Sequence, residues 1–171
     1  DNGMTWSAPS ALNSNAPDTG NDQDPRLTTN GAGNWVAVWR SNENLSGTIG
    51  TDADVLVSSS IDNGATWSVA SALNSNAVAD SGPDYDPALT TDGAGNWVAV
   101  WMSEDSLGDT IGTDGDVLVS TSTDNGATWS APSVLNSSAA TDNSYDFYPT
   151  IATDGAGNWV AVWRSNENLS G

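Results

Sequence analysis

Gly31-Ala-Gly-Asn-Trp-Val-Ala-Val-Trp39 is the stretch that decides the fold of this chain, because it returns unchanged at Gly93–Trp101 and again at Gly155–Trp163. The copies are spaced by about 62 residues, and self-similarity at a fixed period of this length is typical of repeat proteins. In such proteins each unit buries its apolar side against the next unit. The sequence therefore predicts about three copies of one structural unit.

Each unit contains apolar stretches that are short and rich in β-branched or aromatic residues, which favours strands over helices. Clusters of Gly, Asn and Asp separate these stretches. In the most regular unit we expect strands at Pro87–Thr91, Asn96–Ser103, Asp116–Thr123 and Thr128–Leu135. Four antiparallel strands in a unit of this size match one blade of a β-propeller, so the expected fold class is all-β.

The second strand of the unit is predicted to be covered on both sides. Trp97, Ala99 and Trp101 point to one face of the sheet, and Val98 and Val100 point to the other, because successive side chains alternate along a strand. Neither face is polar, so we expect the tryptophans to pack between neighbouring blades. The alternative is a platform on which sugar rings stack.

The predicted blades divide the chain as a single partial propeller. Residues 1–23 would supply the outer strand of a split blade, and residues 24–85 and 86–147 would form two blades. Residues 148–171 would form the first two strands of a further blade. Propellers typically use about 4–8 blades, so about three are too few to close a ring.

Two explanations of the incomplete ring stay open. The sequence is a window onto a longer chain, or separate copies associate to complete the ring. Unpaired strand edges at Trp6–Leu12 and Trp159–Arg164 would favour self-association, since an open edge pairs readily with another chain.

A second motif recurs between the third and fourth expected strands. Ser60-Ile-Asp-Asn-Gly-Ala-Thr-Trp67 and Ser122–Trp129 resemble the Asp-box, or bacterial neuraminidase repeat, and Asp1–Trp6 is a copy without the leading Ser. The resemblance implies a sialidase-like propeller, part of a six-bladed ring, in which the box is a structural turn away from the catalytic centre. The residues that it assigns to these turns are Asp1, Gly3, Thr5, Trp6, Ser60, Asp62, Gly64, Thr66, Trp67, Ser122, Asp124, Gly126, Thr128 and Trp129.

The resemblance also implies a catalytic set that the sequence does not reveal. Family sialidases place an arginine triad, a tyrosine with a glutamate partner and an aspartate acid at the centre of the propeller. Of the three arginines here, Arg26, Arg40 and Arg164, the last two occupy the same repeat position. Near-identical blades offer little asymmetry for a catalytic site. We assign no catalytic residue and expect a non-catalytic scaffold or binding module. A fragment of a sialidase-like glycoside hydrolase and an edge-to-edge assembly protein are the alternatives.

The charge of the chain limits its partners. There are 22 acidic and 3 basic residues, for a net charge of -19. Such a surface repels nucleic acid and anionic membranes, and no apolar run is long enough to span a bilayer. A divalent cation, a glycan or a protein ligand is expected instead. The chain starts at Asp1 without Met or a signal segment, which suits a secreted or surface protein or an excised fragment.

Strand direction predicts where a functional face would lie. The tight turns between first and second strands should share one face with the Asp-boxes, and the long acidic loops should share the opposite face. Clustered carboxylates suit Ca²⁺. Alternatively, these residues cap turns and keep the surface soluble. The candidate metal ligands are Asp52, Asp54, Asp80, Asp84, Asp86, Asp114 and Asp116.

Overall fold

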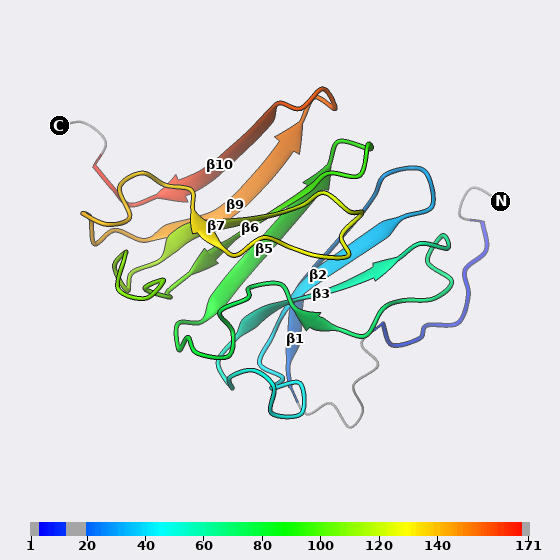
Figure 1. Ribbon diagram of the computed structural model, residues 1–171, viewed down its shortest axis with the longest axis horizontal. Helices are drawn as coiled ribbons and strands as arrows, with labels where there is room; N and C mark the ends of the chain where they lie inside the picture. Colours follow the sequence, from blue (N-terminus) through cyan, green and yellow to red (C-terminus); the bar gives the residue numbers. More distant parts are fainter. Residues whose placement is uncertain (1–3, 13–19, 169–171) are drawn as a thin grey trace.

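The computed structural model describes residues 4–12 and 20–168, and the regular structure of these residues consists of strands. None of their segments is a helix long and apolar enough to cross a membrane. The strands form three antiparallel sheets that lie side by side (Figure 1). The all-β prediction is confirmed. The strands are β1 (Asp22–Thr29), β2 (Trp35–Ser41), β3 (Asp54–Ser60), β4 (Ser71–Ala72), β5 (Asp84–Thr91), β6 (Trp97–Ser103), β7 (Asp116–Ser122), β8 (Ser133–Val134), β9 (Asp146–Thr153) and β10 (Trp159–Ser165).

The first sheet (β1 to β4) and the second sheet (β5 to β8) have the same order and register. In each, the four strands pair in chain order. Trp35 of β2 lies opposite Ser60 of β3, and Trp97 of β6 lies opposite Ser122 of β7. The third sheet contains β9 and β10. The first strands β1, β5 and β9 contact one another in that order, which lines up the inner edge of the array.

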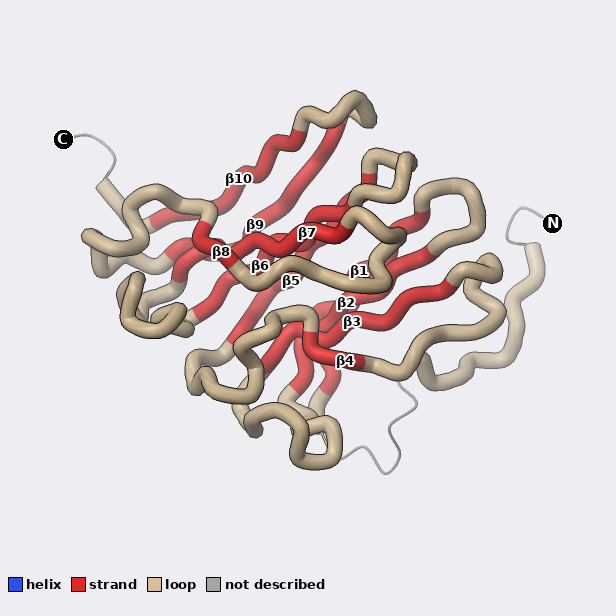
Figure 2. The backbone as a smooth tube through the Cα atoms, viewed as in Figure 1, coloured by secondary structure: helices blue, strands red, loops and turns tan. Residues whose placement is uncertain are grey.

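The fourth strand of each complete sheet is much shorter than the sequence predicts. Instead of Thr128–Leu135, only Ser133–Val134 forms β8 (Figure 2). Before this short strand, a serine side chain takes the place of one backbone acceptor of the ladder, while the Ser130 N–H still donates to the Thr121 carbonyl at 2.8 Å. The Ser130 hydroxyl oxygen accepts the backbone N–H of Thr121 at 3.1 Å. Ser68 does the same for Ser59 in the first sheet, at 3.0 Å.

The sheets stack through two different apolar faces. The Trp face of a sheet carries the two Trp and the Ala of the Trp-Val-Ala-Val-Trp strand, and the Val face carries its two Val. In the first seam, Trp97 and Trp101 of the second sheet pack on Val36 and Val38 of the first. In the second seam, the Trp face of β10 packs on the Val face of β6. Both faces of β6 are buried, as the alternation predicted.

The two outermost faces of the stack are not alike. On the third sheet the Val face is open, with Val160 63% and Val162 56% exposed. On the first sheet the Trp face is covered in part, because Leu12 packs against a cluster that contains Trp39. No strand forms over residues 4–12, and Trp6 is 88% exposed. The assignment of residues 1–23 to a split blade stays a prediction.

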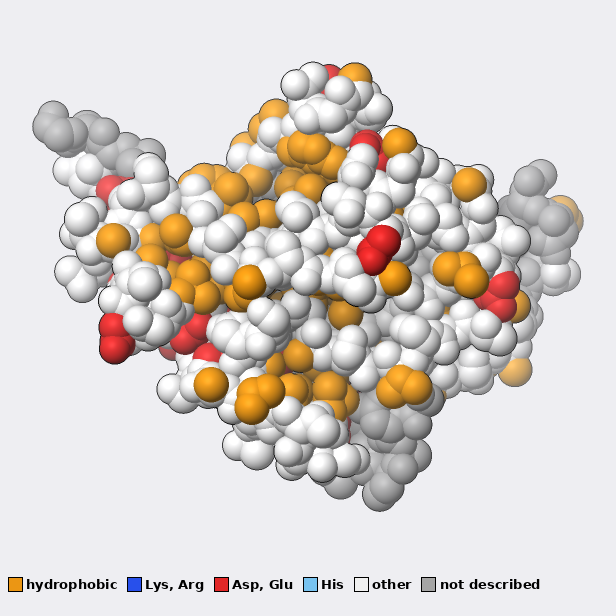
Figure 3. All heavy atoms as spheres, viewed as in Figure 1, with side chains coloured by type: hydrophobic (Ala, Val, Ile, Leu, Met, Phe, Trp, Pro, Cys, Tyr) orange, Lys and Arg blue, Asp and Glu red, His pale blue; other side chains and the backbone are white. Residues whose placement is uncertain are grey.

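Loops divide between the two ends of the strands as strand direction predicts. At one end, the Asn63 N–H of the Asp-box donates to the Gly33 carbonyl of the β1–β2 turn at 3.0 Å. At the other end, the Gly50 N–H of the β2–β3 loop donates to the Ala77 carbonyl of the β4–β5 loop at 2.9 Å. The loops at this second end define the acidic face, where carboxylates are visible at the lower left of Figure 3.

Candidate cation sites on the acidic face

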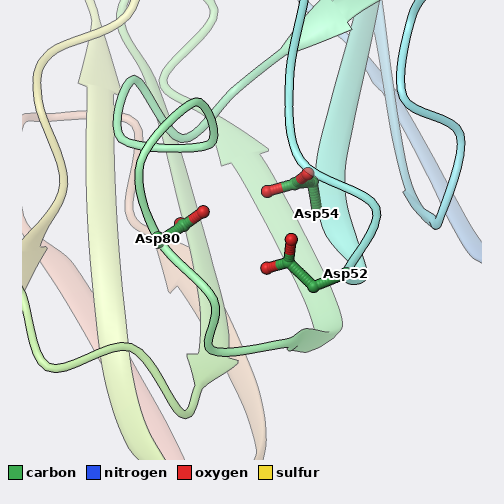
Figure 4. Close-up of side chains that lie close together, drawn as sticks. All are labelled: Asp52, Asp54 and Asp80. Atoms are coloured by element: carbon green, nitrogen blue, oxygen red, sulfur yellow. The ribbon is translucent and has the colours of Figure 1, made fainter. Parts of the chain in front are cut away.

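Three aspartates from two loops and a strand converge on the acidic face of the first sheet. Asp54 opens β3, Asp52 lies two residues before it, and Asp80 lies in the β4–β5 loop. Each offers a carboxylate oxygen, and these atoms lie within 4.8 Å of one another. Figure 4 shows the three side chains pointing toward one another. We call this group the first triad.

A second triad repeats this arrangement one period later. Asp114, Asp116 and Asp142 also bring carboxylate oxygens within 4.8 Å of one another. Asp116 opens β7 as Asp54 opens β3. Asp142 was missing from the predicted ligands, although its distance from Asp80 in the sequence equals the repeat period. The equivalence of the repeats was therefore the signal that would have found it.

One oxygen of the strand aspartate in each triad is held by an asparagine. In the first triad, Asn74 Nδ2 donates to Asp54 Oδ1 at 2.9 Å and to Asp80 Oδ2 at 3.3 Å. In the second, Asn136 Nδ2 donates to Asp116 Oδ1 at 2.7 Å. The amides orient these carboxylates and leave further oxygens free to bind a ligand.

Every member of both triads has a buried carboxylate oxygen without a hydrogen-bond partner among the described residues. Buried acceptors are normally satisfied, so these oxygens are available to accept a further partner. Carboxylate oxygens that converge without donors suit a hard cation. The atoms are Asp52 Oδ2, Asp54 Oδ2, Asp80 Oδ1, Asp114 Oδ2, Asp116 Oδ2 and both Asp142 oxygens.

The triads lack neutralising charge, and this raises the pKa of their members. Burial, with repulsion from Asp80 and Asp52, raises the pKa of Asp54 to about 7 against the opposing Asn74 hydrogen bond. Burial and the charges of Asp52 and Asp105 raise the pKa of Asp80 to about 6. The pKa of Asp116 rises to about 6, mainly through burial. A bound cation would reverse this balance, because it favours the ionised carboxylates.

Asp84 lies close to the first triad and is almost completely buried. It is 1% exposed, and neither carboxylate oxygen has a hydrogen-bond partner of adequate geometry among the described residues. Burial raises its pKa well above the usual value against the nearby Ser103 and Trp101 side chains, which lower it, and the charges of Asp54 and Asp80 add to the increase. Asp146 is the equivalent residue near the second triad, where burial also raises the pKa.

Asp86, which the sequence grouped with the metal ligands, lies elsewhere. The register of β5 and β6 shifts between Tyr85 and Ala88, and Asp86 has a left-handed φ of 50°. This bulge turns Asp86 away from Asp84. Burial and the charge of Asp24 raise the pKa of Asp86, and the nearby Arg26 and Arg40 lower it.

The first triad is also connected to the next sheet. Asn76 Nδ2 donates to Asp80 Oδ2 at 2.8 Å and to Asp105 Oδ2 at 2.6 Å. Asp105 belongs to the β6–β7 loop of the second sheet and is 8% exposed. An ion bound at the triad would therefore act on two loops of its own sheet and, through Asn76, on the neighbouring sheet.

The Asp-boxes lie at the opposite end of the strands and use their carboxylates internally. Asp62 Oδ1 accepts the Ser60 hydroxyl and the Thr66 N–H, both at 2.8 Å, and Asp62 Oδ2 accepts the Thr66 hydroxyl at 2.6 Å. Trp67 Nε1 donates to the Gly64 carbonyl at 3.2 Å. The hydrogen bonds to the Asp62 carboxylate lower its pKa to about 2, and the bond from the Thr66 hydroxyl contributes most.

The second box repeats this network. Asp124 accepts the Ser122 hydroxyl at 2.8 Å and the Thr128 hydroxyl at 2.6 Å, and Trp129 Nε1 donates to the Gly126 carbonyl at 3.2 Å. In the N-terminal copy, Asp1 and Gly3 lie outside the described residues, and Thr5 and Trp6 lie in a segment without strand structure. The carboxylates of the two complete boxes therefore accept hydrogen bonds from within their own turns.

Comparisons with known proteins place the fold among glycosidase propellers. No family model and no curated protein matches the sequence. Among solved structures, Hadza microbial sialidase Hz136 is similar with a TM-score of 0.54 and 18% identity, over 85% of this chain and 38% of the sialidase.

An α-L-arabinofuranosidase and an α-L-arabinanase give similar matches. The α-L-arabinofuranosidase Arb93A of Fusarium graminearum, solved with an iminosugar inhibitor, has a TM-score of 0.54 and 18% identity over 86% of this chain and 43% of its own. The α-L-arabinanase of Penicillium chrysogenum, solved with arabinobiose, has a TM-score of 0.53 and 16% identity over 83% of this chain and 40% of its own. This chain thus spans less than half the length of these enzymes. With the repeated boxes and sheets, the matches show that it folds as consecutive blades of a sialidase-like β-propeller.

Proposed function

We propose that this chain is a non-catalytic, secreted or surface-exposed propeller scaffold whose acidic face binds Ca²⁺ at the two triads. The observation that carries the proposal is the same in both repeats: three converging carboxylates, each with a buried oxygen that no donor in the described part of the chain satisfies. Surface acids that serve only solubility stay solvated, and they need not converge. The Asp-box carboxylates, which are fully used by turn hydrogen bonds, show the contrast within the same chain.

Calcium suits this donor set better than other common cations. It takes 6–8 oxygen ligands in flexible geometry, so three carboxylates can be supplemented by water and backbone carbonyls. Magnesium demands near-ideal octahedral geometry and dehydrates reluctantly. The chain has no cysteine and no histidine, so neither thiolate nor imidazole ligands are available. Extracellular modules bind Ca²⁺ with dissociation constants of about 10⁻⁴–10⁻³ M, and for a secreted or surface protein we expect an affinity in this range.

The role of the ion would be to fix the acidic loops. Asp52 and Asp80 lie in different loops, and ionised they repel one another. Bound Ca²⁺ would turn this repulsion into attraction and hold the β2–β3 and β4–β5 loops together. Rigid loops on one face of a propeller can present a defined surface to a glycan or protein ligand.

Calcium titration tests the proposal directly. We expect isothermal titration to show two sites per chain, and saturating Ca²⁺ to raise Tm relative to EDTA. At a concentration 100 times the dissociation constant, one site adds about 2.7 kcal/mol of stability, which corresponds to about 5–10 °C in a chain of this size. Mg²⁺ at matched ionic strength controls for screening. Absence of both binding heat and a Tm shift would remove the proposed function.

A second candidate function is a portion of a glycoside hydrolase. It rests on the inner strands, where the carboxyl of Asp86 lies near Asp24, Arg26 and Arg40, and where the Arg40 guanidinium lies 4.4 Å from the Tyr85 ring centre. Neighbouring carboxyls, arginines and a tyrosine are groups from which glycosidase sites are built.

Fluorogenic sialosides and arabinosides distinguish the two candidates. The scaffold proposal predicts no hydrolysis above the rate without protein, because the glycosidase likeness extends to the fold alone. Turnover that Asp86→Asn abolishes, while Asp92→Asn leaves it unchanged, would favour the hydrolase. Asp92 serves as the control because it lies in the β5–β6 turn, where its carboxylate accepts turn N–H groups.

A further inference from the structure

The Val face of the third sheet is an apolar surface whose equivalents elsewhere in the chain are buried. β10 has the same sequence as β2, Trp-Val-Ala-Val-Trp-Arg-Ser. In β2, Val36 and Val38 are 0% exposed, whereas Val160 and Val162 of β10 are 63% and 56% exposed. Since the sequences are identical, the difference lies in what covers the face and not in what it is made of.

The two seams within the chain show what covers such a face. In each, the Val face receives the Trp face of the following sheet, and no other kind of surface is used. The complement of Val160 and Val162 is therefore a Trp-x-Ala-x-Trp strand in the same orientation. This chain carries one such strand at the opposite end of the stack, in β2, where Trp39 and Ala37 face away from the second sheet.

The Trp face of β2 is only partly occupied. A groove of about 190 Å³ lies against it, lined in part by Leu12, Pro25, Ala37 and Trp39. Leu12 occupies the place that Leu73 has in the first seam, where Leu73 packs in the cluster that contains Trp101. The segment that carries Leu12 therefore stands where the outer strand of a preceding blade would stand, without the inner strands of that blade.

We infer that a second copy of the chain supplies those inner strands. The Val face of β9 and β10 in one copy packs on the Trp face of β2 in the other, beside the segment that contains Leu12. The same contact formed twice closes a two-fold dimer. Each of its shared blades combines β9 and β10 of one copy with residues 4–12 of the other. The contact repeats the packing of the two internal seams, so it needs no new type of interface.

Sedimentation or light scattering across a concentration series tests the inference. We expect the wild-type chain to have twice the 17.6 kDa mass of one copy. Val160→Glu with Val162→Glu places two charges on the open Val face and should make the protein monomeric, raising the dissociation constant by at least about 100-fold. Because both side chains are exposed in the single chain, the variant should keep its circular dichroism spectrum, and its Tm should no longer depend on protein concentration, whereas the Tm of the dimeric wild type should rise with concentration.

Two further variants make the test specific. Leu12→Glu, on the opposite end of the stack, should also give monomers. Ile61→Glu, which adds a charge at an 80% exposed side chain in an Asp-box turn, should leave the dimer intact. A wild-type chain that stays monomeric at about 100 μM overturns the inference, and so does a dimer that survives the Val160 and Val162 changes. The first result would indicate that a blade in the same polypeptide, or another protein, covers this face. Larger assemblies that these changes abolish would support the face-to-face contact.

Discussion

Replacing Trp101 by alanine is expected to lower the free energy of unfolding by about 3–5 kcal/mol. Trp101 is fully buried in the seam between the first and second sheets, where it packs with Val36 and Val38. The truncation removes an indole and leaves a cavity between two sheets that bury their apolar faces against each other. Urea unfolding followed by circular dichroism measures the loss. The whole stability of a domain is about 5–15 kcal/mol, so this change approaches the limit for folding.

Two matched variants show whether the seam is responsible. Trp6→Ala changes the same side chain at a position that is 88% exposed, and it should alter stability by less than about 0.5 kcal/mol. Trp163 lies at the repeat-equivalent position in the partly covered third sheet. The loss of stability in Trp163→Ala should lie between the losses in Trp101→Ala and Trp6→Ala. Equal losses at all three positions would contradict stacking through the Trp faces as the source of stability.

The repeat made the centre of each blade predictable from the sequence. β6 and β7 were expected at Asn96–Ser103 and Asp116–Thr123 and lie at Trp97–Ser103 and Asp116–Ser122. Burial on both faces of β6 followed from the absence of polar residues among its alternating side chains. The fourth strand was not predictable in this way, because side-chain hydrogen bonds such as that of the Ser130 hydroxyl, which takes the place of a backbone acceptor, leave no mark in the alternation of apolar residues.

The acidic face was predictable in its location but not in its details. Asp84 and Asp86 are two residues apart, so alternation along a strand places them on the same side of β5. The bulge after Tyr85 breaks that alternation, and only Asp84 lies near the first triad. An aspartate can also adopt the regular extended conformation of a strand, so the residue type at this position does not predict the bulge. Asp142, by contrast, needed only the repeat equivalence with Asp80.

The two triads also connect the charge of the chain with its stability. A fold with a net charge of -19 repels itself, and buried carboxylates add to that cost. In a protein without calcium, the triads can reduce the repulsion only by keeping protons. With calcium, the same carboxylates are ionised and bridge loops. The direction in which stability changes with pH therefore distinguishes the calcium-free protein from the calcium-bound one.

Asp54→Asn combined with Asp116→Asn is expected to abolish most of the calcium stabilisation, about 2.7 kcal/mol per site at 100 times the dissociation constant. Asparagine keeps an oxygen for the Asn74 and Asn136 amides but removes the charge that binds the ion. In EDTA the effect reverses. Near pH 8 the variant should be more stable than the wild type, because it lacks buried repelling charges. Thermal unfolding with and without calcium measures both effects.

The pH dependence in EDTA follows from the raised pKa values. Asp54 and Asp116 have native pKa values of about 7 and about 6 against an ordinary 3.8, so the native state holds protons that the unfolded chain has released. The contribution of these carboxyls to wild-type stability is therefore fully present below about pH 4. It is lost as the pH rises to about 7, and the loss is on the order of 2 kcal/mol per triad. The double variant should lose most of this slope. Asp92→Asn controls for charge, since the first repeat has Asn30 at that position. A wild-type protein that gains stability from pH 5 to 8 without calcium would contradict the assignment.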